Sequence, residues 1–201
     1  MKLIFATRNA GKLRELRELL AELPALEICS LDDFPEVPAE LPETADTFAA
    51  NAQMKAEAVA HATGLAALAD DSGLEVDALG GRPGVASARY AGPGANDADR
   101  VAKLLHELAG VADDERSARF RCVVALVAPG HPDAVVLREG CCEGTILRAP
   151  RGAQGFGYDP VFFVPALGKT FAEVSGAEKH RHSHRGRAMR AIAEVLRQRS
   201  A

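Results

Sequence analysis

The sequence predicts an α/β, or mixed α+β, protein with an elongated central mixed sheet flanked by helices. Two observations carry this prediction. Short apolar runs alternate with segments of helical periodicity in the first half of the chain, whereas two longer apolar runs follow each other directly in the second half. Alternation favours parallel strands joined by helices, and consecutive strands favour a meander. A mixed sheet therefore follows, rather than a purely doubly wound one.

The first elements alternate strand, helix and strand. Residues 2–6 form an apolar run that predicts a short buried strand, and residues 27–30 predict a second one. Between them, leucines recur at helical spacing up to Leu23, and Pro24 is expected to end this helix. Its charged residues, Glu15 among them, are expected on the outer face. Residues 29–41 then read as a loop because two prolines and two adjacent aspartates interrupt them.

A second helix is predicted over residues 44–63. Thr47 is a suitable N-terminal cap, and Gly64 supplies a C-terminal stop. Residues 65–69 then predict a compact strand. We expect the next four residues, Asp-Ser-Gly preceded by another Asp, to leave this strand in a tight turn before an extended stretch at 74–76.

The remaining elements are predicted from the same signals. They are a helix at 97–108, strands at 117–128 and 134–143 joined by a turn that includes Pro129 and Gly130, a short strand at 161–164, and a last helix at 184–199.

Length and composition bound the class of protein. The chain has 201 residues, of which 47 % are hydrophobic and 26 % charged, with no long tract free of charge. These values indicate a globular protein and exclude a disordered chain, a collagen and a membrane span. We expect a single two-lobed domain over residues 1–201. The opening segment lacks the apolar region and cleavage site of a signal peptide, so the expected location is the cytoplasm and no membrane partner is expected.

Charge and cysteine content narrow the possible partners. Lysine and arginine number 24 against 28 acidic residues, giving a net charge of −4 and no overall field that would attract nucleic acid. Cys29, Cys122, Cys141 and Cys142 lack the paired spacing of a zinc site, and we expect them to be reduced, mostly buried, small apolar residues.

A turn between the first predicted strand and helix is a candidate anion site. It comprises Thr7, Arg8, Asn9, Ala10, Gly11 and Lys12. The first turn of a helix offers backbone N–H groups and the positive end of the helix dipole, and Lys12 adds a full charge. The segment lacks the complete glycine-rich phosphate loop, so an ordinary strand-to-helix turn remains an equal alternative.

Two adjacent carboxylates follow the apolar strand at 65–69. Successive side chains of extended backbone point to opposite faces, so Asp70 and Asp71 cannot perform the same task. One could bind Mg²⁺ or activate water while the other orients its surroundings. The alternative is a common Asp-Ser-Gly turn.

Three polar residues near the second helix extend this candidate site. Glu43 precedes the helix, and Asn51 and Lys55 lie four positions apart on one helical face. Each alone is more typical of a solvated surface residue. Together with the aspartate pair they suit a metal and polyphosphate site, because Mg²⁺ prefers oxygen ligands and phosphates need cations.

Two further strings are unusual. Residues 155–160 combine two glycines with Phe156, Tyr158, Asp159 and a proline, so the backbone could approach a planar base that an aromatic ring covers. The alternative is a rigid turn before an edge strand. Residues 179–187 are strongly basic and are expected to be extended before the last helix. We favour a patch for a small anionic ligand there over zinc or nucleic acid.

Five strings, in order, resemble the inosine triphosphate pyrophosphatase family. They are ATRNAGK, PETADTFAANAQMKA, ADDSGLEVDALGGRPGVASARYAG, GFGYDPVF and EKHRHSHRGRA. The resemblance implies a sheet in two lobes with a cleft between them and a homodimer. It also implies Mg²⁺-dependent hydrolysis of purine nucleoside triphosphates with non-standard bases (ITP, dITP and XTP) to the monophosphate and pyrophosphate.

The resemblance also implies roles for individual residues. Thr7 to Lys12 would bind the triphosphate, Glu43 and Asp71 would hold the metal, and Asp71 would also accept a proton as the catalytic residue. Asn51, Lys55 and Asp70 would organise phosphates and metal. The remaining substrate contacts would come from Ser72, Phe156, Gly157, Tyr158, Asp159, Lys179, His184 and Arg185.

The resemblance leaves some features and alternatives open. Many family members have glycine where this chain has Arg8, and neither residues 95–115 nor the Cys141-Cys142 pair carries an assignable motif. The alternatives are a pyrophosphatase or phosphatase with another base preference, a non-catalytic nucleotide-binding module, and a nucleic-acid binder that uses the basic run.

Overall fold

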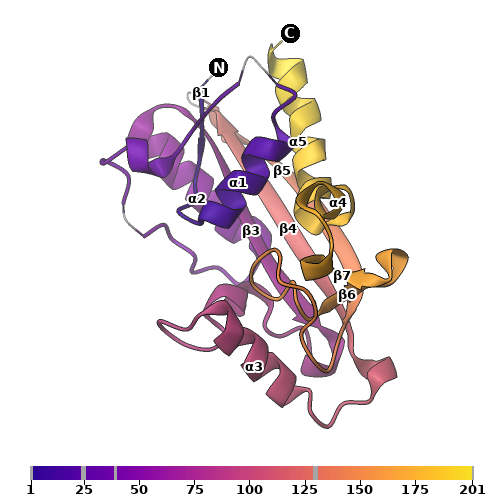
Figure 1. Ribbon diagram of the computed structural model, residues 1–201. Coiled ribbons are helices and arrows are strands. Elements are labelled where there is room, and N and C mark those ends of the chain that lie inside the picture. Colours follow the sequence, from indigo (N-terminus) through magenta and orange to yellow (C-terminus); the bar gives the residue numbers. More distant parts are fainter. Residues whose placement is uncertain (1, 24–25, 39, 129–130, 201) are drawn as a thin grey trace. The chain divides into compact units, whose positions relative to one another are not determined.

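The computed structural model describes residues 2–23, 26–38, 40–128 and 131–200 (Figure 1). The predicted roles of Pro24, Pro129 and Gly130 in ending a helix and making a turn lie outside these residues. The helices and strands are β1 (Lys2–Phe5), α1 (Ala10–Leu19), β2 (Glu27–Cys29), α2 (Phe48–Thr63), β3 (Ala66–Val76), α3 (Asp97–Glu107), β4 (Ser117–Ala128), β5 (His131–Ile146), β6 (Phe162–Val164), β7 (Lys169–Thr170), α4 (Gly176–His182) and α5 (His184–Ser200).

The strands of the described residues form one seven-stranded sheet in the order β2-β1-β3-β4-β5-β6-β7. β1 is parallel to β2 and to β3, whereas β6 is antiparallel to β5 and β7. The predicted mixed sheet is therefore confirmed. Its parallel part comes from the alternating first half of the chain, and its antiparallel part from the second half.

The described chain divides into two compact units. Unit 1 comprises residues 1–71, 122–140 and 185–201, and unit 2 comprises residues 72–121 and 141–184, within the described ranges. Strands β3, β4 and β5 contribute residues to both. A single two-lobed domain with a cleft between its lobes stays a prediction.

The core of unit 1 lies between one face of its strands and the helices α1 and α5, which run side by side in Figure 1. Alternate strand residues such as Phe5, Leu68 and Val124 pack there against Leu16 of α1 and Ile192 of α5. Because side chains alternate along a strand, a residue two positions after Leu68 faces α1 and α5, and the next one faces away from them. This alternation decides the surroundings of the aspartate pair.

Helix α2 begins and ends at the residues that the sequence marks. Thr47 is the N-cap and its hydroxyl accepts a hydrogen bond from Ala50 N (3.2 Å), while Gly64 ends the helix with φ of 66°. Both predicted signals are confirmed. The predicted start at residue 44 is wrong, because the extended backbone of Thr47 (φ −131°, ψ 147°) places the boundary at Phe48.

The turn predicted after residue 69 is wrong. β3 continues through Ser72 and Gly73 to Val76, and Gly73 is not among the described glycines with positive φ. A strand can carry both aspartates in its middle because cationic side chains meet them on either face. Helix α1 also differs from prediction: it ends at Leu19, before the last leucines of its pattern.

The extended conformation predicted for the start of the basic run is wrong. Residues up to His182 belong to α4, whose N-cap Ser175 accepts a hydrogen bond from Glu178 N (3.2 Å). Ser175 followed three positions later by Glu178 is a helix-start signature that the sequence analysis overlooked. The predicted last helix is confirmed and begins at His184.

Unit 2 has its own core, in which residues of β3, α3, β4 and β6 enclose Phe162 and Phe171. All four cysteines are free thiols. Cys122 and Cys142 are buried as expected, whereas Cys29 and Cys141 are partly exposed. None of the helices in the described ranges combines the length and the apolar composition that crossing a membrane requires.

We expect Thr47→Ala to lower the free energy of unfolding by about 1 kcal/mol, because Ala50 N loses its acceptor at the start of α2. Urea titration followed by circular dichroism measures this. Thr47→Ser keeps the hydroxyl and is the matched control, expected to stay within about 0.5 kcal/mol of the wild type. Equal losses in the two variants would contradict the capping role.

Candidate active site

The turn from β1 into α1 has the geometry of a helix N-terminus open to a ligand. Asn9 is the N-cap, and its side chain accepts a hydrogen bond from Lys12 N (3.1 Å) while its own N donates to Thr7 Oγ1 (3.2 Å). Ala10 and Gly11 therefore form the first turn of α1, where N–H groups have no acceptor within the helix. Arg8 reaches sideways to Asp32 (2.9 Å), and both side chains are well exposed.

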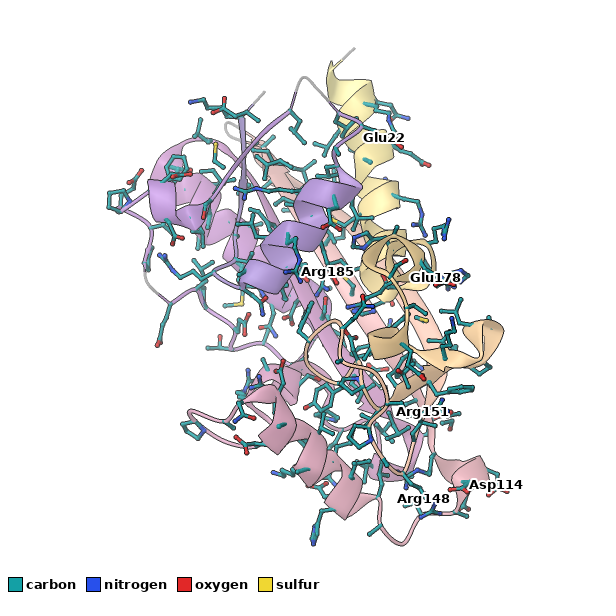
Figure 2. All side chains as sticks on the ribbon, in the orientation of Figure 1. Glu22, Asp114, Arg148, Arg151, Glu178 and Arg185 are labelled. Carbon is teal, nitrogen blue, oxygen red and sulfur yellow. The ribbon has the colours of Figure 1, made fainter. Side chains whose placement is uncertain are left out.

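Asp70 lies at the centre of a buried charge cluster on the α1 and α5 side of β3. The residue is 1 % exposed; Oδ1 accepts from Lys12 Nζ (2.9 Å) and Oδ2 from the guanidinium of Arg185 (3.1 and 3.2 Å). Figure 2 shows Arg185 beside α1, where its Nη1 also donates to Glu15 (2.5 Å). A series of ion pairs therefore links α1, α5 and β3, running from Glu15 through Arg185 and Asp70 to Lys12.

Asp71 faces the opposite side of β3 and belongs to a second cluster. Its Oδ1 accepts from Lys55 Nζ (3.2 Å) and its Oδ2 from Asn51 Nδ2 (3.2 Å), both from α2. The same ammonium donates to Glu43 Oε1 (2.6 Å) and to the Asp70 carbonyl (2.8 Å). The prediction that the two aspartates point to opposite faces is confirmed, and Asn51 and Lys55 do share one face of α2.

The two neighbouring carboxyl groups differ in electrostatics. Burial by itself raises the pKa of Asp70, but Lys12, Arg185 and Lys55 outweigh it and hold that pKa well below its usual range. Burial also raises the pKa of Asp71, and there Lys55 and Lys12 do not outweigh it because the carboxylates of Glu43 and Asp70 raise it further. Lys55 is desolvated, yet Asp71, Asp70 and Glu43 raise its pKa, so it stays an ammonium.

The donor set near Asp71 suits a hard divalent cation. Glu43 and Asp71 both contact the Lys55 ammonium, which brings the two carboxylates near each other. The described residues contain no group of three or more His, Cys, Asp or Glu side chains arranged to hold a metal ion. Two carboxylates are nonetheless the usual protein share of a Mg²⁺ site whose other ligands are water and phosphate.

The loop with two glycines and two aromatics lies in unit 2. Asp159 is buried and pairs with Lys179 Nζ (2.6 Å), and this ammonium also lies over the ring of Phe156, 4.6 Å from its centroid. Tyr158 is buried in the core and its hydroxyl donates to Ser87 O (2.9 Å). Phe156 is only partly buried and is the more exposed of the two predicted aromatic residues.

The other predicted residues are distributed between the units. Ser72 lies in β3 at the start of unit 2. His184 is buried and stacks on Phe120, with ring centroids 4.6 Å apart. Arg185 is only 2 % exposed, so its link to the site runs through Asp70. Unit 1 thus gathers the turn before α1, Glu43, Asn51, Lys55 and both aspartates, and unit 2 gathers Phe156 to Asp159 with Lys179.

Sequence reasoning missed Glu15, which it placed on the outer face of its helix. The structure shows it 7 % exposed and paired with Arg185. Its partner is 170 positions away, so no local pattern names it. The available signal was its spacing of three from Lys12, which puts both residues on one face of α1.

Fold and clusters together define an α/β protein with a separate cluster of charged side chains on each face of β3. The sequence profile of the Ham1 family matches residues 3–195, and the chain belongs to this family. It is 53 % identical over 193 residues to the dITP/XTP pyrophosphatase of Geobacillus kaustophilus, covering 96 % of this chain and 93 % of the relative. It is 54 % identical over 190 residues to the dITP/XTP pyrophosphatase of Gloeobacter violaceus, covering 94 % and 91 %.

Solved structures agree with the sequence comparisons. The HAM1 protein of Coxiella burnetii superposes with a TM-score of 0.90 at 44 % identity, covering 98 % of this chain and 99 % of that one. The nucleoside-triphosphatase / dITP/XTP pyrophosphatase of Mycobacterium abscessus gives 0.76 at 45 % identity, covering 96 % and 98 %. The resemblance stated from the five sequence motifs is confirmed.

We expect Asp70→Asn to lower the free energy of unfolding by about 3 kcal/mol, because it leaves Lys12 and the buried Arg185 without their shared counter-charge. Denaturant unfolding measures this. Asp32→Asn breaks the exposed pair with Arg8 and is the control, with an expected change below about 1 kcal/mol. A similar small change in both variants would show that the buried cluster is not a stabilising unit.

Proposed function

We propose that this chain hydrolyses purine nucleoside triphosphates with non-standard bases, ITP, dITP and XTP, to the monophosphate and pyrophosphate. The observation that carries the proposal is the aspartate pair in the middle of β3, with a separate set of partners on each face of the strand. Such a pair can hold a phosphate-binding lysine with one carboxylate and serve the reaction with the other. The relatives named as dITP/XTP pyrophosphatases support the same substrate class.

Asp70 has the positioning task. Its two oxygens are already engaged by Lys12 and Arg185, and it is enclosed on the α1 and α5 side. It therefore fixes the Lys12 ammonium beside the first turn of α1. A phosphate group there would meet the positive charge of Lys12 together with backbone N–H groups of the helix N-terminus.

Asp71 has the chemical task. We assign it the role of accepting a proton from the attacking water as the water oxygen bonds to the α-phosphorus. The bond from that phosphorus to the oxygen bridging towards the β-phosphorus breaks, and pyrophosphate leaves with the electron pair. Lys12 and Lys55 lie on the two sides of β3 and would offset the charge that builds up on the leaving group.

Glu43 and Asp71 would hold a divalent cation, which we propose to be Mg²⁺. When bound, this ion supplies positive charge to the phosphate oxygens during the displacement. Lys55 then keeps both carboxylates close together, and the Asn51 amide holds the second oxygen of Asp71. These contacts orient the oxygens before substrate arrives.

The base would be contacted by residues 156–159 with Lys179, and Ser72 and His184 would complete the substrate contacts. Phe156 offers a ring face for stacking, and the ion pair of Asp159 with Lys179 fixes the loop next to it. Selection of a 6-oxo over a 6-amino base needs hydrogen-bond donors in the site that pair with the 6-oxygen. With adenine these donors would have no acceptor, and adenine nucleotides would therefore be rejected.

The basic run supports a small ligand more than a nucleic acid. Lys179, His184 and Arg185 are buried, so these residues do not form a continuous exposed strip with the rest of the run. We retain the homodimer and the cytoplasmic location as expectations of the proposed activity.

The proposed reaction predicts pyrophosphate, not orthophosphate, as the released product. A panel of ITP, dITP, XTP, GTP and ATP, assayed with and without Mg²⁺, tests substrate class and metal dependence together. We expect Mg²⁺-stimulated pyrophosphate release from the first three, faster than from GTP or ATP. Orthophosphate release would indicate a phosphatase, and nucleotide binding without turnover a non-catalytic module.

We expect Asp71→Asn to lower kcat about 10³-fold, because the proton acceptor is lost, while nucleotide affinity stays within about tenfold of the wild type. Pyrophosphate release and isothermal titration calorimetry measure the two quantities. Asp46→Asn, at an exposed position before α2, is the control and is expected to retain wild-type turnover. A near wild-type rate for Asp71→Asn would refute the role given to this residue.

A further inference from the structure

The loop of residues 155–159 contains two glycines, so its own residues leave its backbone conformation partly free. Gly155 and Gly157 adopt positive φ of 77° and 64°. Two hydrogen bonds close the loop on itself: Phe156 N donates to Asp159 Oδ2 (2.9 Å), and Asp159 N donates to Phe156 O (3.3 Å). Since glycine accepts either sign of φ, the peptide groups next to it can rotate unless another residue holds them.

A residue from α3 holds one of these peptide groups. Gly157 N donates to Asp97 Oδ2 (2.7 Å), a side chain 60 positions earlier in the sequence. Asp97 is the first residue of α3, in a segment for which the sequence analysis found no motif. The peptide between Phe156 and Gly157 is thus bound at both ends, its carbonyl by Asp159 N and its N–H by Asp97.

The Asp97 carboxylate is itself fixed. Its other oxygen pairs with Arg100 (2.5 Å), and Arg100 donates to the carbonyls of Ala88 (2.8 Å) and Ala95 (2.9 Å). Burial alone raises the pKa of Asp97, but the hydrogen bonds from Arg100 and Gly157 outweigh it and keep the pKa below its usual value. A negative charge at the start of a helix is also favoured by the helix dipole.

We propose that Asp97 is a positioning residue that locks the peptide between Phe156 and Gly157, and so sets the purine selectivity of this site. The inference rests on the proposed function, in which residues 156–159 contact the base. If the peptide rotated, its carbonyl and N–H would exchange directions and the Phe156 ring would shift with its own backbone. A base contact that distinguishes a 6-oxo from a 6-amino group depends on such directions.

The test compares selectivity, taken as the ratio of kcat/KM for ITP to that for ATP. We expect Asp97→Ala to lower this ratio about tenfold through a higher KM for ITP, the size of effect that follows from losing a hydrogen bond to a charged group. The kcat for ITP is expected to stay within about threefold, because the Asp71 cluster is untouched. Asp97→Asn keeps an oxygen acceptor for Gly157 N and is expected to restore the ratio to within about threefold.

Asp99→Ala is the matched control. Asp99 Oδ2 accepts from Asn96 N (2.9 Å) and caps the same helix, so this variant destabilises the start of α3 as Asp97→Ala does. We expect it to lower the melting temperature and leave the selectivity ratio unchanged. A selectivity loss in Asp99→Ala equal to that in Asp97→Ala would overturn the inference, because helix stability alone would then explain both.

Phe156→Ala separates failure of the inference from failure of its basis. Altered selectivity in Phe156→Ala with unchanged selectivity in Asp97→Ala overturns the role of Asp97 and leaves the base contact standing. Unchanged selectivity in Phe156→Ala overturns the base contact, and the role of Asp97 with it. A wild type that releases no pyrophosphate from ITP overturns the proposed function itself.

A measurement on the wild type covers the case in which Asp97→Ala does not fold. The inference predicts that the amide of Gly157 is protected in hydrogen exchange followed by NMR, because Asp97 holds its proton. Exchange of this amide at the rate of an open loop would overturn the inference without any variant.

Discussion

The contact on which the site depends is the buried carboxylate of Asp70 between Lys12 and Arg185. A carboxylate without partners would not remain ionised at this depth, and a guanidinium as enclosed as that of Arg185 needs a counter-charge. Glu15 supplies a second one. These charged residues come from α1, β3 and α5. Ion pairs as well as the apolar core therefore join the first and the last helix of the chain to the sheet. The lysine that we propose to bind phosphate is thereby held in place by the same contacts that join these elements.

Because side chains alternate along β3, the two adjacent aspartates have different environments. Asp70 faces an enclosed region with two cationic partners, whereas Asp71 faces α2, where Lys55 is shared with Glu43. The Cα atoms of Asp70 and Asp71 are only about 3.8 Å apart, as in any trans-linked pair of residues. The surroundings of the two side chains nevertheless shift their pKa values in opposite directions. A loop at this point would not impose that separation, so the uninterrupted strand is the basis of the different tasks that we propose for the two carboxylates.

What the sequence predicted well was local or periodic. Thr47 and Gly64 mark α2, and strand alternation alone placed Asp70 and Asp71 on opposite faces. The prediction of a turn after Ala69 was wrong. The Asp-Ser-Gly string favours a turn, but cationic side chains from distant parts of the sequence pair with the aspartates and stabilise them within a strand. The burial of Glu15 and the contact of Asp97 with Gly157 depend on partners 170 and 60 positions away, which no window of sequence contains. Helix α4 could have been predicted from the sequence, because Ser175 and Glu178 have the spacing of a helix N-terminus.

The side chain of Asn51 shows how the segment before α2 is attached to the site. Its amide oxygen accepts from Ala45 N (2.9 Å) and its amide nitrogen donates to Ala45 O (3.1 Å), much as a neighbouring strand would pair with that residue. Two positions earlier, Glu43 reaches Lys55, one turn along α2 from Asn51. The number of residues between Glu43 and Asn51 is therefore constrained, because an insertion there would move the carboxylate out of register with Lys55. Length variation among relatives should instead accumulate before Glu43, where the chain makes no such paired contact within residues 34–38 and 40–42 of the described structure.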